Sequence, residues 1–402
     1  MRRRAWLSSA VLLAVVAALG LAGCSAEQQP APAPRIIEPA PPIPAPRTPE
    51  PAPAAADLMI TPESVAGDDS TAALQAALDG LGPGQTVLFA PGEYRHAKVL
   101  TVRVPDVTIA GPGAQLIATD EEHSAFHIAA DGVTVQGLSF GVQATSERWY
   151  AWEQMKVRIS TAGVVLRDVT VTGSAASGIF VGDGAADFTL DHVVVRDTRA
   201  DGIHITDGAH GGRVDSPLVE RSGDDGVAVV SYGTDDEVSR DITVTSPTVN
   251  GTTWGRGISV VGGERITYTD VDVRDTNAAG IYLAVEGDPY NTRSVSDVRV
   301  QGGMVSGANY NSEIDHGGVL VYNGRSGEDL TGVVVDAVTV RGTRPSASQS
   351  VAIFAVDGSV SGVTLSDMVI EGGPGRPFAT RGGPTDYSLD RWQVDGQAYQ
   401  PD

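Results

Sequence analysis

The sequence has a single cysteine, Cys24, so an intrachain disulfide bond is excluded. It has only two lysines, Lys98 and Lys156, and its 50 acidic residues outweigh 28 basic residues to give a net charge of −22. No basic patch is visible, and so acidic a chain is not expected to bind nucleic acid. Aromatic residues are also scarce, at 5% of the chain. No second apolar segment follows the one near the N-terminus.

The N-terminus has the composition of an export signal. Arg2, Arg3 and Arg4 precede an apolar run that extends from Ala5 to about Leu21 and ends in small residues. A basic stub, an apolar stretch and a processing point indicate a signal peptide over residues 1–23 rather than a membrane-spanning helix.

The four residues that close this segment are Leu21-Ala22-Gly23-Cys24, and they resemble the lipobox of bacterial lipoproteins. The resemblance implies that Cys24 is acylated and becomes the mature N-terminus. An ordinary secretory signal with an unrelated cysteine is the alternative. Because the only cysteine occupies the one position that a lipobox requires, we expect a lipid anchor at the extracytoplasmic face of the cell membrane.

A linker rich in proline and alanine follows, over residues 24–57. Such a segment buries no core and extends by roughly 3.1 Å per residue, which gives a semi-rigid stalk on the order of 80 Å long. We expect one folded domain over residues 58–384. A terminal strand or cap is expected over residues 385–402, with Trp392 as its anchor.

A short repeat dominates the folded part. A glycine precedes alternating β-branched residues in SGIFV, DGIHI, DGVAV, RGISV and AGIYL, and the spacings between these glycines are 24, 24, 31 and 23 residues. The glycines are Gly178, Gly202, Gly226, Gly257 and Gly280. Further short strands rich in valine and threonine lie between them, bounded by turn residues.

A period near 23 residues with two or three short strands matches one coil of a right-handed parallel β-helix, a single-stranded all-β solenoid. No helical periodicity supports βαβ units, and neither leucine-rich repeats nor propeller blades fit the spacing. The alternation predicts four pairs of core residues: Ile203 and Ile205, Val227 and Val229, Ile258 and Val260, and Ile281 and Leu283.

An amphipathic helix is expected at the N-terminal end of the stack. The segment DDSTAALQAALDGL begins at Asp68 with N-cap residues and places Leu74, Leu78 and Leu81 on one face. Such a helix would cover the open end of the solenoid, whose edge strands would otherwise aggregate. This helix and the strand after it resemble the start of pectin-lyase-fold proteins.

The coil register gathers acidic residues. The residue before the repeat glycine is Asp201, Asp225 and Arg256 on three successive coils, with Asp224 beside them. A parallel β-helix stacks equivalent positions at about one strand spacing, so these side chains should form a ladder. Crowded carboxylates repel, and the pKa of at least one should rise. Glycoside hydrolysis needs one protonated acid beside ionised neighbours.

These coils resemble glycoside hydrolase family 28, the polygalacturonases. The matching segments are Arg199-Ala200-Asp201-Gly202, Gly223-Asp224-Asp225-Gly226 and Gly255-Arg256-Gly257. The resemblance implies an inverting mechanism in which Asp224 is the general acid, while Asp201 and Asp225 activate water. Inversion also predicts carboxyl groups roughly 6.5 to 9.5 Å apart. Ordinary turn residues or metal ligands are the alternative roles for these aspartates.

Two departures from the family affect the expected substrate. Arg256 replaces the motif histidine, and the family's Arg-Ile-Lys motif is absent because the next coil reads Gly280-Ile281-Tyr282-Leu283. A neutral polysaccharide or oligosaccharide is therefore expected, with Arg256 on a hydroxyl or a single acidic group. No cofactor and no metal site are expected, since the seven histidines lack close ligand spacing.

Other side chains should line the same groove. Two residues beyond the repeat glycines, Phe180, His204 and Tyr282 are expected to point outward. His204 would flank Asp201 or be a solvated surface residue, and the two aromatic rings would stack on sugars. The loop SERWYAWEQMK contributes Trp149 and Trp152 to one wall. The opposite wall is predicted to contain Tyr290, Tyr310 and His316.

The sequence thus predicts an extracytoplasmic glycoside hydrolase that is a monomer. One alternative is a polysaccharide lyase or epimerase on the same fold, which would use an arginine or lysine base, usually with calcium. Another is a non-catalytic surface protein that binds glycan along the groove.

Overall fold

The computed structural model describes residues 55–65, 67–384 and 386–400. The predicted signal peptide, Cys24 and the linker up to residue 54 lie outside the described residues. Among the helices that are described, none has the length and apolar character needed to cross a membrane.

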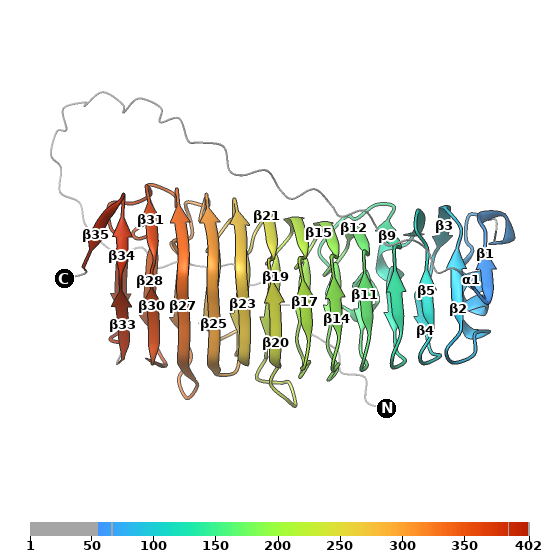
Figure 1. The fold of residues 1–402 in the computed structure, drawn as a ribbon, viewed down its shortest axis with the longest axis horizontal. Helices are drawn as coiled ribbons and strands as arrows, with labels where there is room; N and C mark the ends of the chain where they lie inside the picture. The colour runs from blue at the N-terminus through green and yellow to red at the C-terminus, as the bar shows by residue number, and fades with distance from the viewer. Residues whose placement is uncertain (1–54, 66, 385, 401–402) are drawn as a thin grey trace, which may run out of the picture. The chain divides into compact units, whose positions relative to one another are not determined.

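The described chain is a right-handed parallel β-solenoid of about 12 turns, which confirms the predicted fold class. Its strands stack side by side in chain order along one axis (Figure 1). One face is an eleven-stranded parallel sheet. Its strands are β4 (Leu100–Val102), β7 (Phe126–Ile128), β10 (Val157–Ile159), β13 (Ile179–Val181), β16 (Ile203–Ile205), β19 (Val227–Val230), β22 (Ile258–Val261), β24 (Ile281–Val285), β26 (Val319–Asn323), β28 (Val351–Ala355) and β32 (Phe378–Arg381).

Two further ladders complete each coil, and the long strands β23 (Gly263–Arg274), β25 (Val295–Ser306) and β27 (Asp329–Arg341) run through both. One ladder contains β1 (Leu58–Ile60), β2 (Thr86–Phe89), β5 (Thr108–Ala110), β8 (Thr134–Gln136), β11 (Val165–Arg167), β14 (Thr189–Asp191), β17 (Arg213–Asp215), β20 (Arg240–Thr245), β29 (Ser359–Ser361), β30 (Val363–Ser366) and β33 (Tyr387–Asp390). The other contains β3 (Gly92–His96), β6 (Ala114–Ala118), β9 (Ser139–Val142), β12 (Thr170–Ser174), β15 (Val194–Thr198), β18 (Leu218–Ser222), β21 (Thr248–Thr252), β31 (Val369–Glu371), β34 (Trp392–Val394) and β35 (Gln397–Tyr399).

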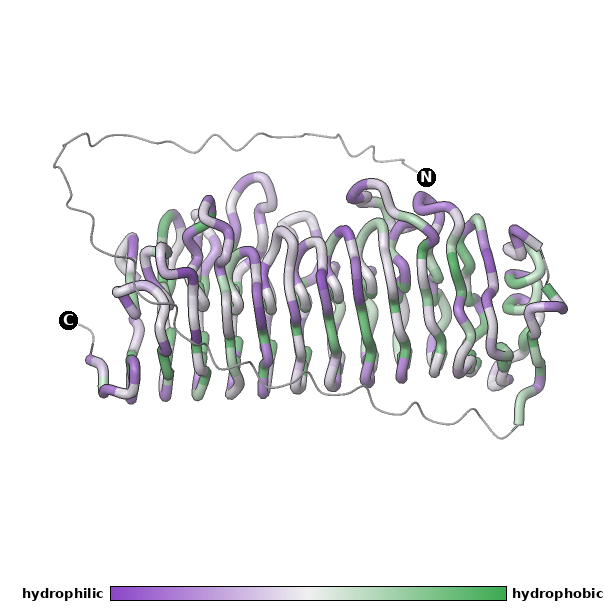
Figure 2. The backbone as a smooth tube through the Cα atoms, turned by 90° about the horizontal axis from the view of Figure 1, so that it is seen from above, coloured by the Kyte–Doolittle hydropathy of each residue, from purple (hydrophilic) through white to green (hydrophobic). Residues whose placement is uncertain are grey.

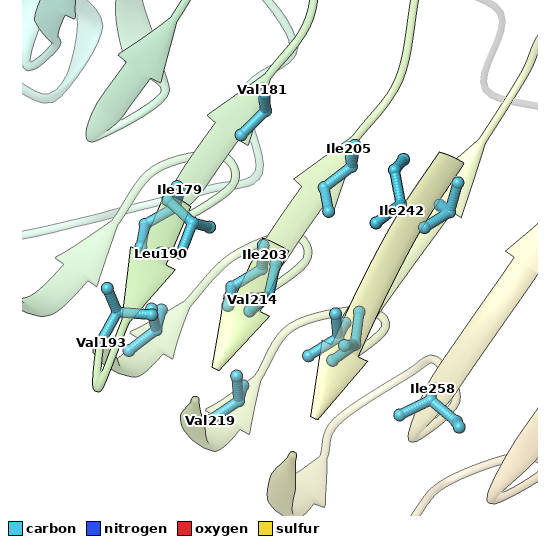
Figure 3. Close-up of a cluster of buried hydrophobic side chains, with 14 of the residues drawn as sticks. Ile179, Val181, Leu190, Val193, Ile203, Ile205, Val214, Val219, Ile242 and Ile258 are labelled. Atoms are coloured by element: carbon cyan, nitrogen blue, oxygen red, sulfur yellow. The ribbon is translucent and has the colours of Figure 1, made fainter. Parts of the chain in front are cut away.

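The core follows the predicted alternation. All eight residues predicted to point inward on β16, β19, β22 and β24 are fully buried. Equivalent residues stack from coil to coil, as Ile179 and Ile203 do in Figure 3. Each coil therefore buries its apolar face against its neighbours, which is the main stabilising contribution in a solenoid.

The repeat glycine is required by the close approach of the next coil. A Cβ atom on Gly226 would lie 2.6 Å from the carbonyl oxygen of Gly257, too close for any other residue. The backbone N–H of Gly226 donates to that same oxygen at 2.9 Å. The glycine column therefore fixes the register in which the residues before it stack.

The two ends of the solenoid are closed differently. Helix α1 (Thr71–Asp79) lies at the N-terminal end and buries Leu74 and Leu78, whereas Leu81 is buried beyond the helix C-terminus. The remaining helices are the 3-10 turns η1 (Pro62–Val65), η2 (Glu121–His123) and η3 (Trp152–Gln154). At the C-terminal end β33 and β34 continue the parallel ladders past residue 384, and β35 closes an antiparallel hairpin. Trp392 is buried there, and its indole N–H donates to the Leu365 carbonyl oxygen at 2.8 Å.

Longer loops protrude from one side of the solenoid (Figure 2). Five connections of nine or more residues join strands of the eleven-stranded sheet to the other ladders: residues 143–156 before β10, 231–239 after β19, 286–294 after β24, 307–318 before β26 and 342–350 before β28. These loops supply side chains that the coil repeat itself does not specify.

Candidate active site

The predicted carboxylates converge at the entrances of β16 and β19. One oxygen each of Asp201, Asp224 and Asp225 lies within 4.8 Å of the others. The three residues are 7%, 7% and 4% exposed, so their charges interact through protein rather than bulk water. Backbone hydrogen bonds from Gly202 to Asp225 and from Gly226 to the Arg256 carbonyl oxygen, both 2.9 Å, show the register that stacks them.

Asp201 is held in its ionised form. Its Oδ2 accepts a hydrogen bond from His204 Nδ1 at 2.5 Å, and its Oδ1 accepts one from the Asp225 backbone N–H at 2.9 Å. Burial alone would raise the pKa of Asp201, but the His204 imidazole and the Arg148 guanidinium outweigh burial and hold that pKa below its ordinary value. Asp201 is therefore ionised and can accept a proton from a water molecule that becomes acidic as it attacks an electrophilic carbon.

Asp224 has the opposite environment. Burial, followed by the charges of Asp201 and Asp225, raises the pKa of Asp224 to about 7. Its Oδ2 accepts a hydrogen bond from Arg148 Nη1 at 2.7 Å, while its Oδ1 is buried and has no hydrogen-bond partner among the described residues. A Cβ on Gly255 would lie 2.3 Å from that oxygen, so the glycine makes room for the carboxyl group. A carboxyl group that is partly protonated at neutral pH is suited to proton donation.

Asp225 is fixed by the neighbouring coil. Its Oδ1 accepts from the Arg256 backbone N–H at 2.7 Å and faces the Arg256 side chain at 3.5 Å, and its Oδ2 accepts from Ser259 Oγ at 2.5 Å. Arg256 also contacts Glu286 Oε1 at 2.5 Å and lies 4.2 Å above the Tyr282 ring. The charge of Arg256 is thus already balanced by two carboxylates.

The outward column has the predicted register, but His204 and Tyr282 are buried and Phe180 is only partly exposed. Strand pairing places Phe180, His204 and Tyr282 in one column, in which Ala228 and Ser259 lie between His204 and Tyr282. His204 is buried against Asp201, and its ring stacks on Phe180 with centroids 5.6 Å apart. The prediction that Tyr282 is an outward stacking platform is wrong, because it is 3% exposed and its ring is covered by Arg256 and His316.

The two aromatic candidates in the loop before β10 differ. Trp152 is 40% exposed and packs against His127 and Arg158, two coils to the N-terminal side of the carboxylates. Trp149 is only partly exposed, and its backbone N–H donates to the Ala175 carbonyl oxygen at 2.8 Å. Trp152 and Phe180 therefore both contact Arg158, and no contact joins Trp149 to the three aspartates among the described residues.

On the other side of the site, Tyr290 and His316 line a pocket that begins at Arg256, as predicted for the opposite wall. Tyr310 is directed elsewhere, since its hydroxyl donates to the Thr252 carbonyl oxygen at 2.7 Å.

Three residues of the site were not identified from the sequence. Arg148 reaches Asp224 from the 143–156 loop and lies between the rings of Tyr150 and Trp254, at 5.4 and 5.6 Å. Tyr232 stacks 6.5 Å from His204, and burial together with the nearby carboxylates raises its pKa above the ordinary value. Glu286, the third, binds Arg256. All three lie in loops outside the repeat, so no periodic signal marks them.

The oxygens of the carboxylate cluster lie close enough together to hold a cation, which is the role of metal ligands left open above as an alternative for these aspartates. Guanidinium groups already contact two of the three aspartates. Among the described residues, no other group of three acidic, histidine or cysteine side chains brings its ligand atoms this close together. The local balance of charge is therefore supplied by Arg148 and Arg256.

The parallel β-helix of this chain is of the pectate lyase-like class, whose members include carbohydrate-active enzymes. The chain belongs to the family described as rhamnogalacturonase A/epimerase, pectate lyase-like, whose model matches residues 64–282. That range includes all three aspartates and Arg256. No curated protein sequence matches the chain. The narrower resemblance to polygalacturonases stays a prediction.

Solved structures show the same fold. The catalytic unit of an α-1,3-glucanase of glycoside hydrolase family 87 from Streptomyces thermodiastaticus is 18% identical, with a TM-score of 0.58 over 88% of this chain and 73% of that chain. The A-module of the Azotobacter vinelandii mannuronan C-5 epimerase AlgE4 is 13% identical, with a TM-score of 0.55 over 83% of this chain and 100% of that chain. At these identities the similarity is one of fold alone.

Proposed function

We propose that this protein is an extracytoplasmic glycoside hydrolase that cleaves a neutral polysaccharide or oligosaccharide by aspartate-based acid and base catalysis. The observation that carries the proposal is the contrast within one cluster: the pKa of Asp224 is raised to about 7 while that of Asp201 is lowered. Two carboxyl groups whose pKa values are pushed apart in this way are suited to act as acid and base.

In this mechanism the protonated Asp224 carboxyl group donates its proton to the glycosidic oxygen as the bond to the sugar carbon breaks. Asp201, supported by Asp225, accepts a proton from the water that attacks that carbon. The His204 N–H keeps Asp201 oriented and ionised, and Ser259 orients Asp225. After one turnover Asp224 regains a proton from solvent, and Asp201 releases to solvent the proton that it accepted from the water.

Inversion of the anomeric centre is part of this proposal and rests on the resemblance to family 28. The nearest carboxylate oxygens, within 4.8 Å, are closer than the separation of roughly 6.5 to 9.5 Å expected between the carboxyl groups of an inverting enzyme. The anomer first released, observed by NMR, decides between inversion and retention.

A neutral substrate follows from the charge balance around Arg256. Its guanidinium is occupied by Asp225, Glu286 and the Tyr282 ring, so it offers little to a sugar carboxylate. The acidic surface of the chain also repels a polyuronate. One structural neighbour is named an α-1,3-glucanase, which places α-1,3-glucan among the substrates to be tried.

The proposed location is the outer face of the cell membrane, with a lipid on Cys24 and the linker as a stalk for a monomeric domain. A polymer outside the cell is then within reach of the groove.

The test incubates the purified protein with α-1,3-glucan, pectins, alginate and other cell-wall polysaccharides. New reducing ends without ultraviolet-absorbing products support hydrolysis. Unsaturated products would identify a lyase, a change of sugar configuration without cleavage would identify an epimerase, and binding without any product would identify a glycan-binding protein. Asp224→Asn is the matched variant, and retention of full hydrolysis in it removes Asp224 from the role of acid.

A further inference from the structure

A pocket with a volume of about 350 Å³ extends from Arg256, beside the carboxylates, towards the C-terminal end of the solenoid. Arg256, which contacts Asp225, lines its near end, and Arg381 on β32 lines its far end. Four coil steps separate β22 from β32. At about 4.8 Å per step the pocket spans about 19 Å. The pocket therefore adjoins the proposed active site at Arg256 and is longer than the space needed around one scissile bond.

The register of the coils builds one side of this pocket. Strand pairing places Tyr322, Phe354 and Arg381 in one column on successive strands β26, β28 and β32. In the neighbouring column, two residues earlier on each strand, the side chains become smaller, from Leu320 to Ala352 and Ala379. Small residues thus leave room beside a ladder of two aromatic rings and one cation.

The ladder presents groups that are free to bind. Arg381 lies 4.8 Å above the Phe354 ring and has no hydrogen-bond or ion-pair partner among the described residues. Tyr322 is partly exposed, and Tyr290 on the facing loop is 49% exposed. The aromatic ring holds the guanidinium group in place while its N–H groups stay unpaired. These N–H groups can therefore donate to a ligand with little further loss of side-chain conformational entropy.

These features match the chemistry of a sugar chain. The C–H face of a pyranose ring packs on an aromatic ring, and its hydroxyl groups accept hydrogen bonds from a fixed donor. Simple packing does not explain the arrangement, since a structural arginine would be expected to have a carboxylate or carbonyl partner. The acidic side chains Glu286, Asp288 and Asp315 also line the pocket, and they disfavour a strongly anionic occupant.

We propose that the ladder Tyr322–Phe354–Arg381 is a binding subsite for neutral sugar rings of a chain that extends from the cleavage point towards the C-terminal coils. This inference rests on the proposed function. It implies that the enzyme selects oligosaccharides by length on this side of the scissile bond, with Tyr322 stacking on one ring and Arg381 donating to hydroxyl groups of another.

The test measures binding separately from catalysis. Full-length protein that carries Asp224→Asn is applied to an array of neutral oligosaccharides of graded length, including α-1,3-linked glucose oligomers, and of their uronate counterparts. Affinity is expected to rise with chain length. Adding Tyr322→Ala should weaken binding of the longer neutral oligomers by about three- to tenfold. Adding Arg381→Ala should weaken it by about tenfold, while disaccharide binding stays unchanged.

Controls separate a binding role from a structural one. Tyr322→Phe should keep the affinity, and Arg299→Ala and Tyr387→Ala, both exposed residues outside the pocket, should not change it. Equal loss at every length, or no loss, overturns the proposal, as does a loss confined to uronate oligomers. If the array shows length-dependent binding but the wild-type protein hydrolyses none of the bound glycans, the subsite stands and the hydrolase proposal fails.

Discussion

Replacing Asp224 with asparagine is expected to make the protein more stable at alkaline pH while it abolishes hydrolysis. The ordinary pKa of an aspartate is 3.8, and burial with two neighbouring carboxylates raises the pKa of Asp224 to about 7. Between these values the folded state holds a proton that the unfolded chain has released. The free energy of unfolding therefore falls as pH rises from about 4 to 7, and an asparagine removes this effect.

The size of the effect follows from the pKa difference. A rise of about three pKa units, each worth about 1.36 kcal/mol, amounts to about 4 kcal/mol above pH 7. About a third of it has already developed at pH 5. The stability of Asp224→Asn relative to the wild type should accordingly grow by about 3 kcal/mol between pH 5 and pH 8. The favourable contact with Arg148 is already contained in the raised pKa.

The measurement is urea denaturation of both proteins at pH 5 and pH 8, followed by tryptophan fluorescence. Asp367→Asn is a suitable control, because Asp367 is an exposed partner of Arg391 and its pKa is lowered rather than raised. That variant should gain no stability at pH 8. If the gap between Asp224→Asn and the wild type does not widen with pH, the carboxylate is not destabilised in the folded state. The assignment of Asp224 as the acid then loses its physical basis.

Three further predictions concern residues around and beyond the carboxylates. Arg148→Met should shift the alkaline limb of the kcat/KM profile upward by about one pH unit, since Arg148 lowers the pKa of Asp224, and an unmoved limb would contradict that role. Lys156 is fully buried, and burial lowers its pKa to about 7. Its Nζ donates a hydrogen bond to the Ser124 carbonyl oxygen at 2.6 Å. Because the folded pKa of Lys156 lies below its unfolded value of 10.5, the wild type loses stability as pH falls from about 10 to 7. Over that range the stability of Lys156→Met, measured by urea titration, should rise by a few kcal/mol relative to the wild type. A stability difference that does not change with pH would refute this prediction. Cys24→Ser should move the protein from the membrane fraction to the soluble extracytoplasmic fraction in cell fractionation, and continued sedimentation with membranes would exclude a lipid anchor.

The sequence alone predicts how the coils stack, because the controlling signal is local and periodic. Alternating valine and isoleucine fill the core, and the glycine that meets the next coil sets the register. Asp201 and Asp225 precede equivalent glycines, so their proximity follows from counting residues. The same counting aligns Phe180 with His204, as the strand pairing shows.

The tertiary structure decides what surrounds these residues. Arg148 is 76 residues from Asp224 in the chain, and no repeat fixes where its loop turns. No repeat fixes the position of Glu286 either. Its bond to Arg256 neutralises the cation that the sequence analysis expected to bind substrate. Tyr282 was expected to be open because its strand position points away from the core, yet neighbouring side chains cover it. Strand periodicity determines which direction a side chain takes, whereas non-local packing of loops determines what it meets and therefore its charge state.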